Sequence, residues 1–206
     1  MKIVLAIEGM DGAGKTSLAR YIQSLCEQHG CQCTPIGRRN GTVSSTVVKL
    51  TQLLREEVLE MTPQADIFVR IAREYQRAHS AASAPPGIVV IDRFVLTILS
   101  LARLHGFDVE MVSPLLREIT TRADLHATIF VHCPFEVATS RVKERSQGLP
   151  PGIRNETLLR RIAEFIEEEF HRGVLTGQQW LVDNSKTPED GAEQLAAYLL
   201  PYLERN

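Results

Sequence analysis

Short apolar runs rich in β-branched residues alternate along the chain with longer segments in which apolar residues recur every three or four positions. The short runs predict strands, and the longer segments predict helices between them. The run 88–91 is apolar at every position, which is typical of a strand covered on both faces. The pattern therefore predicts a parallel α/β sheet with helices on both sides.

Five strands and eight helices are expected. The strands are 2–7, 33–37, 88–91, 128–132 and 180–182. The helices are 15–29, 43–59, 63–82, 95–105, 109–121, 135–145, 156–176 and 188–203. Two of these helices begin at a proline, Pro63 and Pro188, which suits the first helical turn.

Composition fits one globular domain over residues 1–206, since the chain is 44% hydrophobic and 23% charged. No apolar run approaches the roughly 18 residues that span a bilayer, and the first strand meets Glu8 too early for a signal sequence. We therefore expect a cytoplasmic protein that contacts no membrane. The net charge of −2 disfavours a broadly basic surface that binds nucleic acid. Any anion-binding site must therefore be confined to a small part of the molecule.

A glycine-rich segment directly after the first strand has the pattern G-x-x-x-x-G-K-[ST]. It comprises Gly9, Met10, Asp11, Gly12, Ala13, Gly14, Lys15 and Thr16, followed by Ser17. Between a strand and a helix, this pattern predicts a loop whose backbone N–H groups cradle the phosphates of ATP. Lys15 would reach the β- and γ-phosphates, and the Thr16 hydroxyl would ligate Mg²⁺. The alternative is a plain turn carrying a surface lysine.

The second candidate motif is a charged pair, Asp92 and Arg93, which directly follows the apolar run 88–91. The carboxyl ends of parallel strands form the ligand crevice, so Asp92 is expected beside the phosphate loop as a magnesium ligand. Arg93 would bridge the donor and acceptor phosphates. The alternative is that Asp92 caps the next helix while Arg93 pairs on the surface. The NKxD signal of guanine specificity is absent, since 184–187 reads Asn-Ser-Lys-Thr.

In order along nearly the whole chain, several segments resemble motifs of the thymidylate kinases, a family of P-loop nucleoside monophosphate kinases. The segment 8–16 is similar to E-G-x-D-G-x-G-K-[ST], and 92–94 to D-R-[YFSH]. Arg73 stands where the family has an arginine that binds the acceptor base. The segments 123–125, 141–145 and 154–156 are similar to the family's P-D-L, R-x-x-x-R and R-x-E motifs.

The resemblance implies a three-layer α/β/α P-loop kinase fold with a five-stranded parallel sheet and a mobile lid at 146–155. It also implies ATP and Mg²⁺, a small nucleotide acceptor, most directly dTMP or a related pyrimidine nucleotide, and a homodimer. It assigns Arg73 and Phe68 to the acceptor base and Arg145 and Arg154 to the lid. Arg141 would contact the donor nucleotide.

The candidate site follows from these motifs. The catalytic residues are Lys15, Asp92, Arg93, Arg145 and Arg154. The residues for the donor nucleotide are 9–17 and Arg141. Those for the acceptor are Asp11, Arg38, Phe68, Arg73 and Arg93, and those for the metal are Thr16 and Asp92.

Charge governs the expected mechanism. The second pKa of a phosphate monoester is about 6, so the acceptor oxygen is already an anion at neutral pH and needs no general base. The enzyme must instead align two anions and stabilise the transferring group. In the family that the chain resembles, a catalytic arginine lies either in the phosphate loop or in the lid. The variable positions of the loop carry no cation here, so the resemblance implies that the lid supplies the arginine when it closes.

Two segments depart from the family. Residues 38–42 read Arg-Arg-Asn-Gly-Thr where the family has E-P-G-G-T. Residues 97–102 read Thr-Ile-Leu-Ser-Leu-Ala, so the tyrosine and glutamine of the family's S-x-A-Y-Q are missing. Losing hydrogen-bond partners in a substrate pocket shifts specificity, so the identity of the acceptor base is left open.

Two other functions stay open. Related deoxynucleoside kinases use a glutamate at the position of Glu8 as a base toward a sugar hydroxyl, so a nucleoside or another small alcohol is the second candidate acceptor. Asp11 and the Asp92–Arg93 pair favour monophosphate kinases over that class. The third possibility is a regulatory module that binds nucleotide without phosphotransfer.

Overall fold

The computed structural model describes residues 1–37, 62–146, 156–173 and 175–204. The helix expected at 43–59 lies outside the described residues. So do Arg38, Arg154 and all but the first residue of the expected lid, and of Arg145 only the backbone is described. In the described part of the chain, no helix is both long enough and apolar enough to cross a membrane.

The five predicted strands are present and form one parallel sheet. They are β1 (Lys2–Glu8), β2 (Cys33–Ile36), β3 (Gly87–Asp92), β4 (Leu125–His132) and β5 (Gln178–Asp183). Their order is β2-β3-β1-β4-β5, and each neighbouring pair is parallel. The first strand of the sequence therefore lies in the middle of the sheet.

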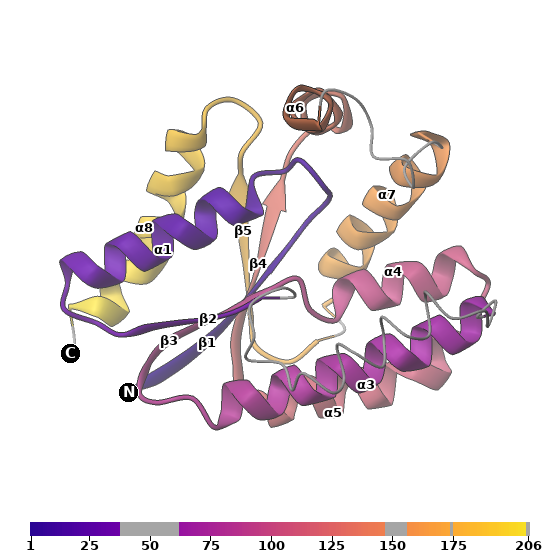
Figure 1. The fold of residues 1–206 in the computed structure, drawn as a ribbon, viewed down its shortest axis with the longest axis horizontal. Coiled ribbons are helices and arrows are strands. Elements are labelled where there is room, and N and C mark those ends of the chain that lie inside the picture. Colours follow the sequence, from indigo (N-terminus) through magenta and orange to yellow (C-terminus); the bar gives the residue numbers. More distant parts are fainter. Residues whose placement is uncertain (38–61, 147–155, 174, 205–206) are drawn as a thin grey trace.

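Helices cover both faces (Figure 1). They are α1 (Lys15–Gln28), α3 (Pro63–Ala82), α4 (Leu96–Leu104), α5 (Val109–Arg122), α6 (Phe135–Ser146), α7 (Glu156–Arg172) and α8 (Pro188–Leu203). Alternate residues of β1 enter two separate cores. Val4 and Ala6 pack with α3, α4, α5 and α7, whereas Leu5 and Ile7 pack with α1 and α8. This double burial explains the continuous apolar runs and confirms the three-layer fold.

The helix boundaries agree with expectation except at one end. The pattern predicts a helix over 156–176, but α7 ends at Arg172. Gly173 follows with φ 63°, and its N–H donates to the carbonyl of Phe170. A glycine in the left-handed conformation ends a helix, and the apolar spacing alone did not reveal this stop.

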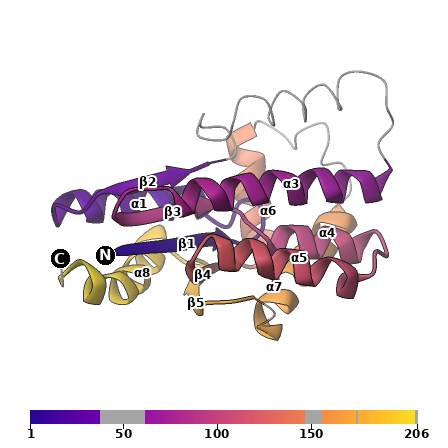
Figure 2. The same ribbon diagram turned by 90° about the horizontal axis from the view of Figure 1, so that it is seen from below.

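The carboxyl ends of the five strands share one edge of the sheet, and the register aligns β1 and β3 there. Ile7 of β1 pairs with Asp92 of β3, so Asp92 lies beside the start of the glycine-rich loop. In Figure 2 the strands are stacked from β2 to β5, with α3 near the β2 end and α7 near the β5 end. Both of these helices contribute residues to the cleft that opens at this edge.

Candidate active site

A cleft of about 820 Å³ opens at the carboxyl edge of the sheet. The glycine-rich loop and α1 contribute Met10, Asp11 and Thr16 to its wall, and the end of β3 contributes Asp92 and Arg93. Residues of α3, α4, α6 and α7 complete the lining. The two motifs that the sequence singled out therefore face one shared space.

The glycine-rich loop leads directly into α1, which begins at Lys15. Gly9, Gly12 and Gly14 have φ values of 137°, 87° and 98°, a region that side chains with a Cβ rarely adopt. The first N–H groups of α1 have no partner within the helix, and the helix dipole makes this end positive. The local geometry is that of an anion-binding loop at a helix N-terminus.

These glycines are also required because other parts of the chain pack closely against the loop. A Cβ at Gly12 would lie 2.0 Å from the Ala138 carbonyl oxygen in α6, and one at Gly14 would lie 2.1 Å from Asn184 Nδ2. Asn184 is buried, and its Nδ2 donates to the Ala13 carbonyl at 2.6 Å. Sequence reasoning missed Asn184. The only signal was a polar residue directly after the last strand.

Lys15 is buried at the base of the loop, where its Nζ donates to the Met10 carbonyl at 2.5 Å. Burial and, to a smaller extent, the nearby Arg93 guanidinium lower the pKa of Lys15 to about 7, although the negative charges of Asp11, Asp92 and Glu8 oppose this shift. The ammonium form is thus costly until an anion arrives. A phosphate beside Lys15 would restore its positive charge.

Arg93 reaches from the end of β3 across to the glycine-rich loop. Its Nη2 donates to the Asp11 carboxylate, and its Nη1 donates to the Gly9 carbonyl at 3.3 Å. Its φ of 56° lies in the left-handed region, which costs about 1–3 kcal/mol for a residue with a side chain. The surrounding structure must therefore hold this turn in place.

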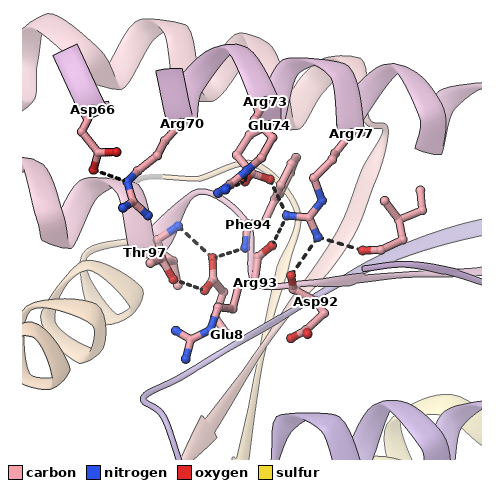
Figure 3. A network of polar contacts seen from close by, with 12 residues as sticks. Glu8, Asp66, Arg70, Arg73, Glu74, Arg77, Asp92, Arg93, Phe94 and Thr97 are labelled. Atoms are coloured by element: carbon pink, nitrogen blue, oxygen red, sulfur yellow. Dashed lines mark hydrogen bonds and ion pairs between the residues drawn. The ribbon is translucent and has the colours of Figure 1, made fainter. Parts of the chain in front are cut away.

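Glu8 holds the same turn from within the core (Figure 3). Its carboxylate accepts hydrogen bonds from the N–H groups of Phe94 and Leu96 at 2.8 and 2.9 Å, and from the Thr97 hydroxyl at 2.9 Å. The side chain is fully buried. Glu8 therefore stabilises the N-terminus of α4, and this geometry gives no support to its interpretation as a base toward a substrate hydroxyl.

The face of α3 that points toward the strand ends carries Asp66, Arg70, Arg73 and Arg77 (Figure 3). Arg73 donates from Nε and Nη2 to Glu74 Oε1, at 3.1 and 2.9 Å, and is almost fully buried. The α3 residue that lines the cleft is Arg70, whose Nε lies 2.6 Å from Asp66 Oδ2.

The resemblance assigns Phe68 to the acceptor base together with Arg73. Five residues separate the two, which places them about 140° apart around the helix axis. Phe68 is 48% exposed and packs edge-on against Phe107, at 5.8 Å between ring centroids. Neither Phe68 nor Arg73 is among the described residues that line the cleft, and their contact with an acceptor base stays a prediction.

Arg141 joins α6 to the segment that follows β5. Its Nη1 donates to the Asn184 carbonyl at 3.0 Å, and its Nη2 donates to the Lys186 carbonyl at 3.4 Å. The Asn184 side chain binds the loop at Ala13, so Arg141 is connected to the phosphate loop through Asn184. Ser17 lies in the first turn of α1 and is exposed.

The segment that departs from the family lies partly in the cleft. Thr97 and Leu101 of α4 line it, while Ala102 is buried in the core. Leu159, Ile162 and Ile166 of α7 add apolar side chains to the lining. The part of the cleft formed by α3, α4 and α7 is therefore largely apolar, and among the described residues that line this part Arg70 is the cation.

Comparison with known proteins identifies the family of this chain. The family model described as Thymidylate kinase matches residues 7–189. A probable thymidylate kinase of Archaeoglobus fulgidus is 25% identical over 203 residues, covering 98% of this chain and 96% of its own length. Thymidylate kinases of Geotalea daltonii and Carboxydothermus hydrogenoformans are each 26% identical, covering 90% and 95% of this chain and 86% and 95% of their own lengths. The chain belongs to the thymidylate kinase family.

Proposed function

We propose that this chain transfers the γ-phosphoryl group of ATP to dTMP, giving dTDP and ADP. The observation that carries the proposal is that the glycine-rich loop, with Lys15 buried at its base, and the Asp92–Arg93 pair meet at one cleft in a chain of this family. The relatives named above are thymidylate kinases, and each matches most of its length.

The chain's own groups suit this transfer. Lys15 sits where the loop would hold the β- and γ-phosphates, and Arg93 projects over the same loop from β3. Two cations on one side of the cleft would offset the charge of the transferring phosphoryl group and align it with the acceptor. Since the acceptor phosphate is already an anion, the engagement of Glu8 with α4 does not hinder the reaction.

Magnesium fits the oxygen donors at this position. The Thr16 hydroxyl and the Asp92 carboxylate both face the cleft, and hydroxyl, carboxylate and phosphate oxygens are the ligands that this hard cation prefers. We propose that Thr16 and Asp92 hold Mg²⁺, which when bound supplies positive charge and orients the terminal phosphates of ATP.

The remaining assignments are parts of the same proposal. Loop residues 9–17 and Arg141 serve the donor nucleotide, and Arg145 and Arg154 enter from a lid at 146–155. Arg38, Asp11 and Arg93 serve the acceptor phosphate. For the acceptor base we expect Arg70 to make contact, since it lines the cleft, whereas Arg73 would have to leave Glu74 to do so. We further propose a homodimer located in the cytoplasm, acting on free nucleotides.

A coupled ADP-release assay tests the function. The acceptors are dTMP, dUMP, UMP, CMP, dCMP, GMP and AMP, beside the free nucleosides. The proposal predicts turnover with dTMP. Turnover with nucleosides alone would establish the second candidate, and ATP binding without turnover of any acceptor would establish a regulatory module. Arg70→Ala should raise the KM for dTMP about tenfold or more, as expected when a pocket loses a polar contact to its substrate.

A further inference from the structure

Arg77 is a fully buried cation at the centre of the molecule that no phosphate motif includes. It lies on α3, two turns beyond Arg70 on the same face of the helix. Its Nη1 pairs with Glu74 Oε2 at 2.6 Å, and Glu74 is also fully buried. A buried ion pair is weak evidence for stability by itself, so its remaining contacts show what it does.

Those contacts are three backbone carbonyls at the ends of two strands. Arg77 Nη2 donates to the Ile36 carbonyl of β2 at 2.8 Å and to the Asp92 carbonyl of β3 at 2.7 Å. Its Nη1 donates to the Arg93 carbonyl at 2.7 Å. One planar guanidinium thus joins the last residue of β2 to both residues of the catalytic turn (Figure 3).

The turn is therefore held from two sides. Arg77 donates to the carbonyls of Asp92 and Arg93, while Glu8 accepts from the N–H groups of Phe94 and Leu96. Held by these two sets of hydrogen bonds, Arg93 keeps the left-handed backbone conformation that directs its side chain toward the phosphate loop. Without the cation, the carbonyls of this turn would lose the partners that fix their direction.

The same helix borders the acceptor half of the cleft. Arg70 of α3 lines the cleft, and Arg77 contacts the catalytic turn through direct hydrogen bonds. A rigid helix thus connects the acceptor wall to the residues that act on the phosphates.

We propose that Arg77, paired with Glu74, is the positioning residue of the Asp92–Arg93 turn and sets the placement of the Arg93 guanidinium relative to the phosphate loop. The proposal rests on the function proposed above. It assigns Arg77 no contact with either nucleotide. Its loss therefore slows transfer while leaving ATP binding intact.

The main test is Arg77→Lys, which keeps the charge and the pairing with Glu74 but replaces the planar fork by one ammonium. We expect kcat to fall about 10- to 100-fold, as displacements of about 1 Å do at catalytic groups, with the Kd for ATP within about twofold of the wild-type value. Arg103→Lys is the matched control. Arg103 pairs with Glu168 and Glu169 at 2.7 and 2.9 Å between α4 and α7 but does not touch the turn. The kcat of the Arg103→Lys variant should stay within about twofold of the wild-type value.

A double-mutant cycle with Arg93→Lys separates positioning from general destabilisation. If Arg77 acts through the turn, Arg77→Lys should cost much less in the Arg93→Lys background than alone. If the fold-losses in kcat of the two single variants simply multiply in the double variant, the proposal is overturned. A folded Arg77→Lys protein with wild-type kcat would also overturn it. If Arg77→Lys does not fold, Glu74→Gln serves as the test variant instead, because it leaves the Arg77 guanidinium in place but removes the negative charge that pairs with it. A folded Glu74→Gln protein with wild-type kcat would equally overturn the proposal.

Hydrogen exchange gives a readout that needs no acceptor. The amides of residues 93–96 should exchange at least about tenfold faster in Arg77→Lys than in wild type or Arg103→Lys, because the turn opens more readily. Unchanged exchange there would overturn the role of Arg77 even if the chain proved inactive toward every monophosphate. An inactive wild-type chain with the predicted exchange pattern would instead refute the proposed function alone.

Discussion

At the scale of single residues, the state of Lys15 governs nucleotide binding. Its pKa in the free protein is about 7, lowered by burial and by Arg93, so above that pH the side chain is mostly neutral. A bound triphosphate favours the ammonium form, and binding must then take up a proton. Affinity for ATP should fall as pH rises, by about tenfold between about pH 8 and pH 9. Titration calorimetry in buffers of different ionisation enthalpy measures both the affinity and the proton uptake.

Lys15→Arg is the control for this pH dependence. Arginine stays charged over the whole range, so its affinity for ATP should vary little with pH and its binding should take up no proton. The phosphates of ATP are fully ionised above about pH 8 and add no titration of their own. An affinity of the wild-type protein that is constant across this range would contradict the buried state of Lys15.

Arg93 should matter to rate rather than to ATP binding. Arg93→Ala removes one of the two cations over the phosphate loop, and we expect kcat to fall about 100-fold or more, as after the loss of charge stabilisation in a transition state. Lys15→Ala should lower turnover to a similar extent. Steady-state kinetics with dTMP check both, and near-normal turnover in either variant would contradict the assignment.

Residues with a local motif could be predicted from the sequence, and those without one could not. The glycine-rich loop that leads to Lys15 follows β1, and the Asp92–Arg93 pair stands at the end of β3, each in a recognisable pattern; the structure brings the loop and the pair to one cleft. Arg77 donates hydrogen bonds to residues 15 and 16 positions away in the sequence, and Asn184 donates to a residue 171 positions away. No local sequence pattern therefore indicates either contact. Phe68 and Arg73 are five residues apart, so the sequence itself predicts that they share a face of the helix only approximately.

At the scale of elements, the tight contact between the phosphate loop and α6 makes Gly12 a sensitive position. Gly12→Ala would place a Cβ 2.0 Å from the Ala138 carbonyl oxygen on a backbone with φ 87°, so α6 or the loop must shift. We expect the free energy of unfolding to fall by about 3 kcal/mol, from overpacking and backbone strain together, with weaker ATP binding. Denaturant unfolding and calorimetry measure the two effects.

Gly30→Ala separates strain from packing. Gly30 has φ 65°, and nothing lies within 4 Å of its added Cβ. It carries the left-handed strain without the clash, so the cost should be about 1 kcal/mol and ATP affinity should not change. Equal effects of the two substitutions would show that the contact with α6 is unimportant.

Element positions were predictable because each strand and helix carries its own pattern. The central strands β1, β3 and β4 are buried on both faces and read as apolar runs, and α3 and α8 begin at the prolines expected to start them. The errors were the start of β4, which lies three residues before the predicted 128, and the end of α7, where one backbone conformation at Gly173 outweighs the apolar spacing that continues beyond it. Such stops depend on a single dihedral angle, which a periodicity does not encode.

At the scale of the whole molecule, Asn184 ties the carboxyl-terminal part of the chain to the phosphate loop. Asn184→Ala removes the buried hydrogen bond to the Ala13 carbonyl, which should cost about 1–3 kcal/mol of stability and loosen the loop. In the wild type, ATP at about 100 times its Kd should add about 2.7 kcal/mol to the free energy of unfolding. At that same ATP concentration the variant should gain less, and an equal gain would contradict this coupling. Denaturant titrations with and without ATP compare them.

The strand order was not predictable from the sequence, although the parallel sheet was. Alternation of strands and helices indicates parallel pairing, but it does not say which strands are neighbours. β1 pairs with β3 and β4 rather than with the next strand in the sequence. That order is what brings Asp92 beside Ile7 and so creates the cleft.

The central place of β1 has a consequence for synthesis on the ribosome. The first strand to be made waits for residues 87–92 and then 125–132 before it has both neighbours. Pairing over such distances along the chain is slow, and until it is complete the apolar faces of β1 are uncovered and prone to aggregate. The hydrogen bond from Asn184 to the Ala13 carbonyl can form only after β5 has been made, because Asn184 follows that strand. A nascent chain should therefore bind nucleotide fully only once residue 184 has been made, and chaperones should be needed most before that point.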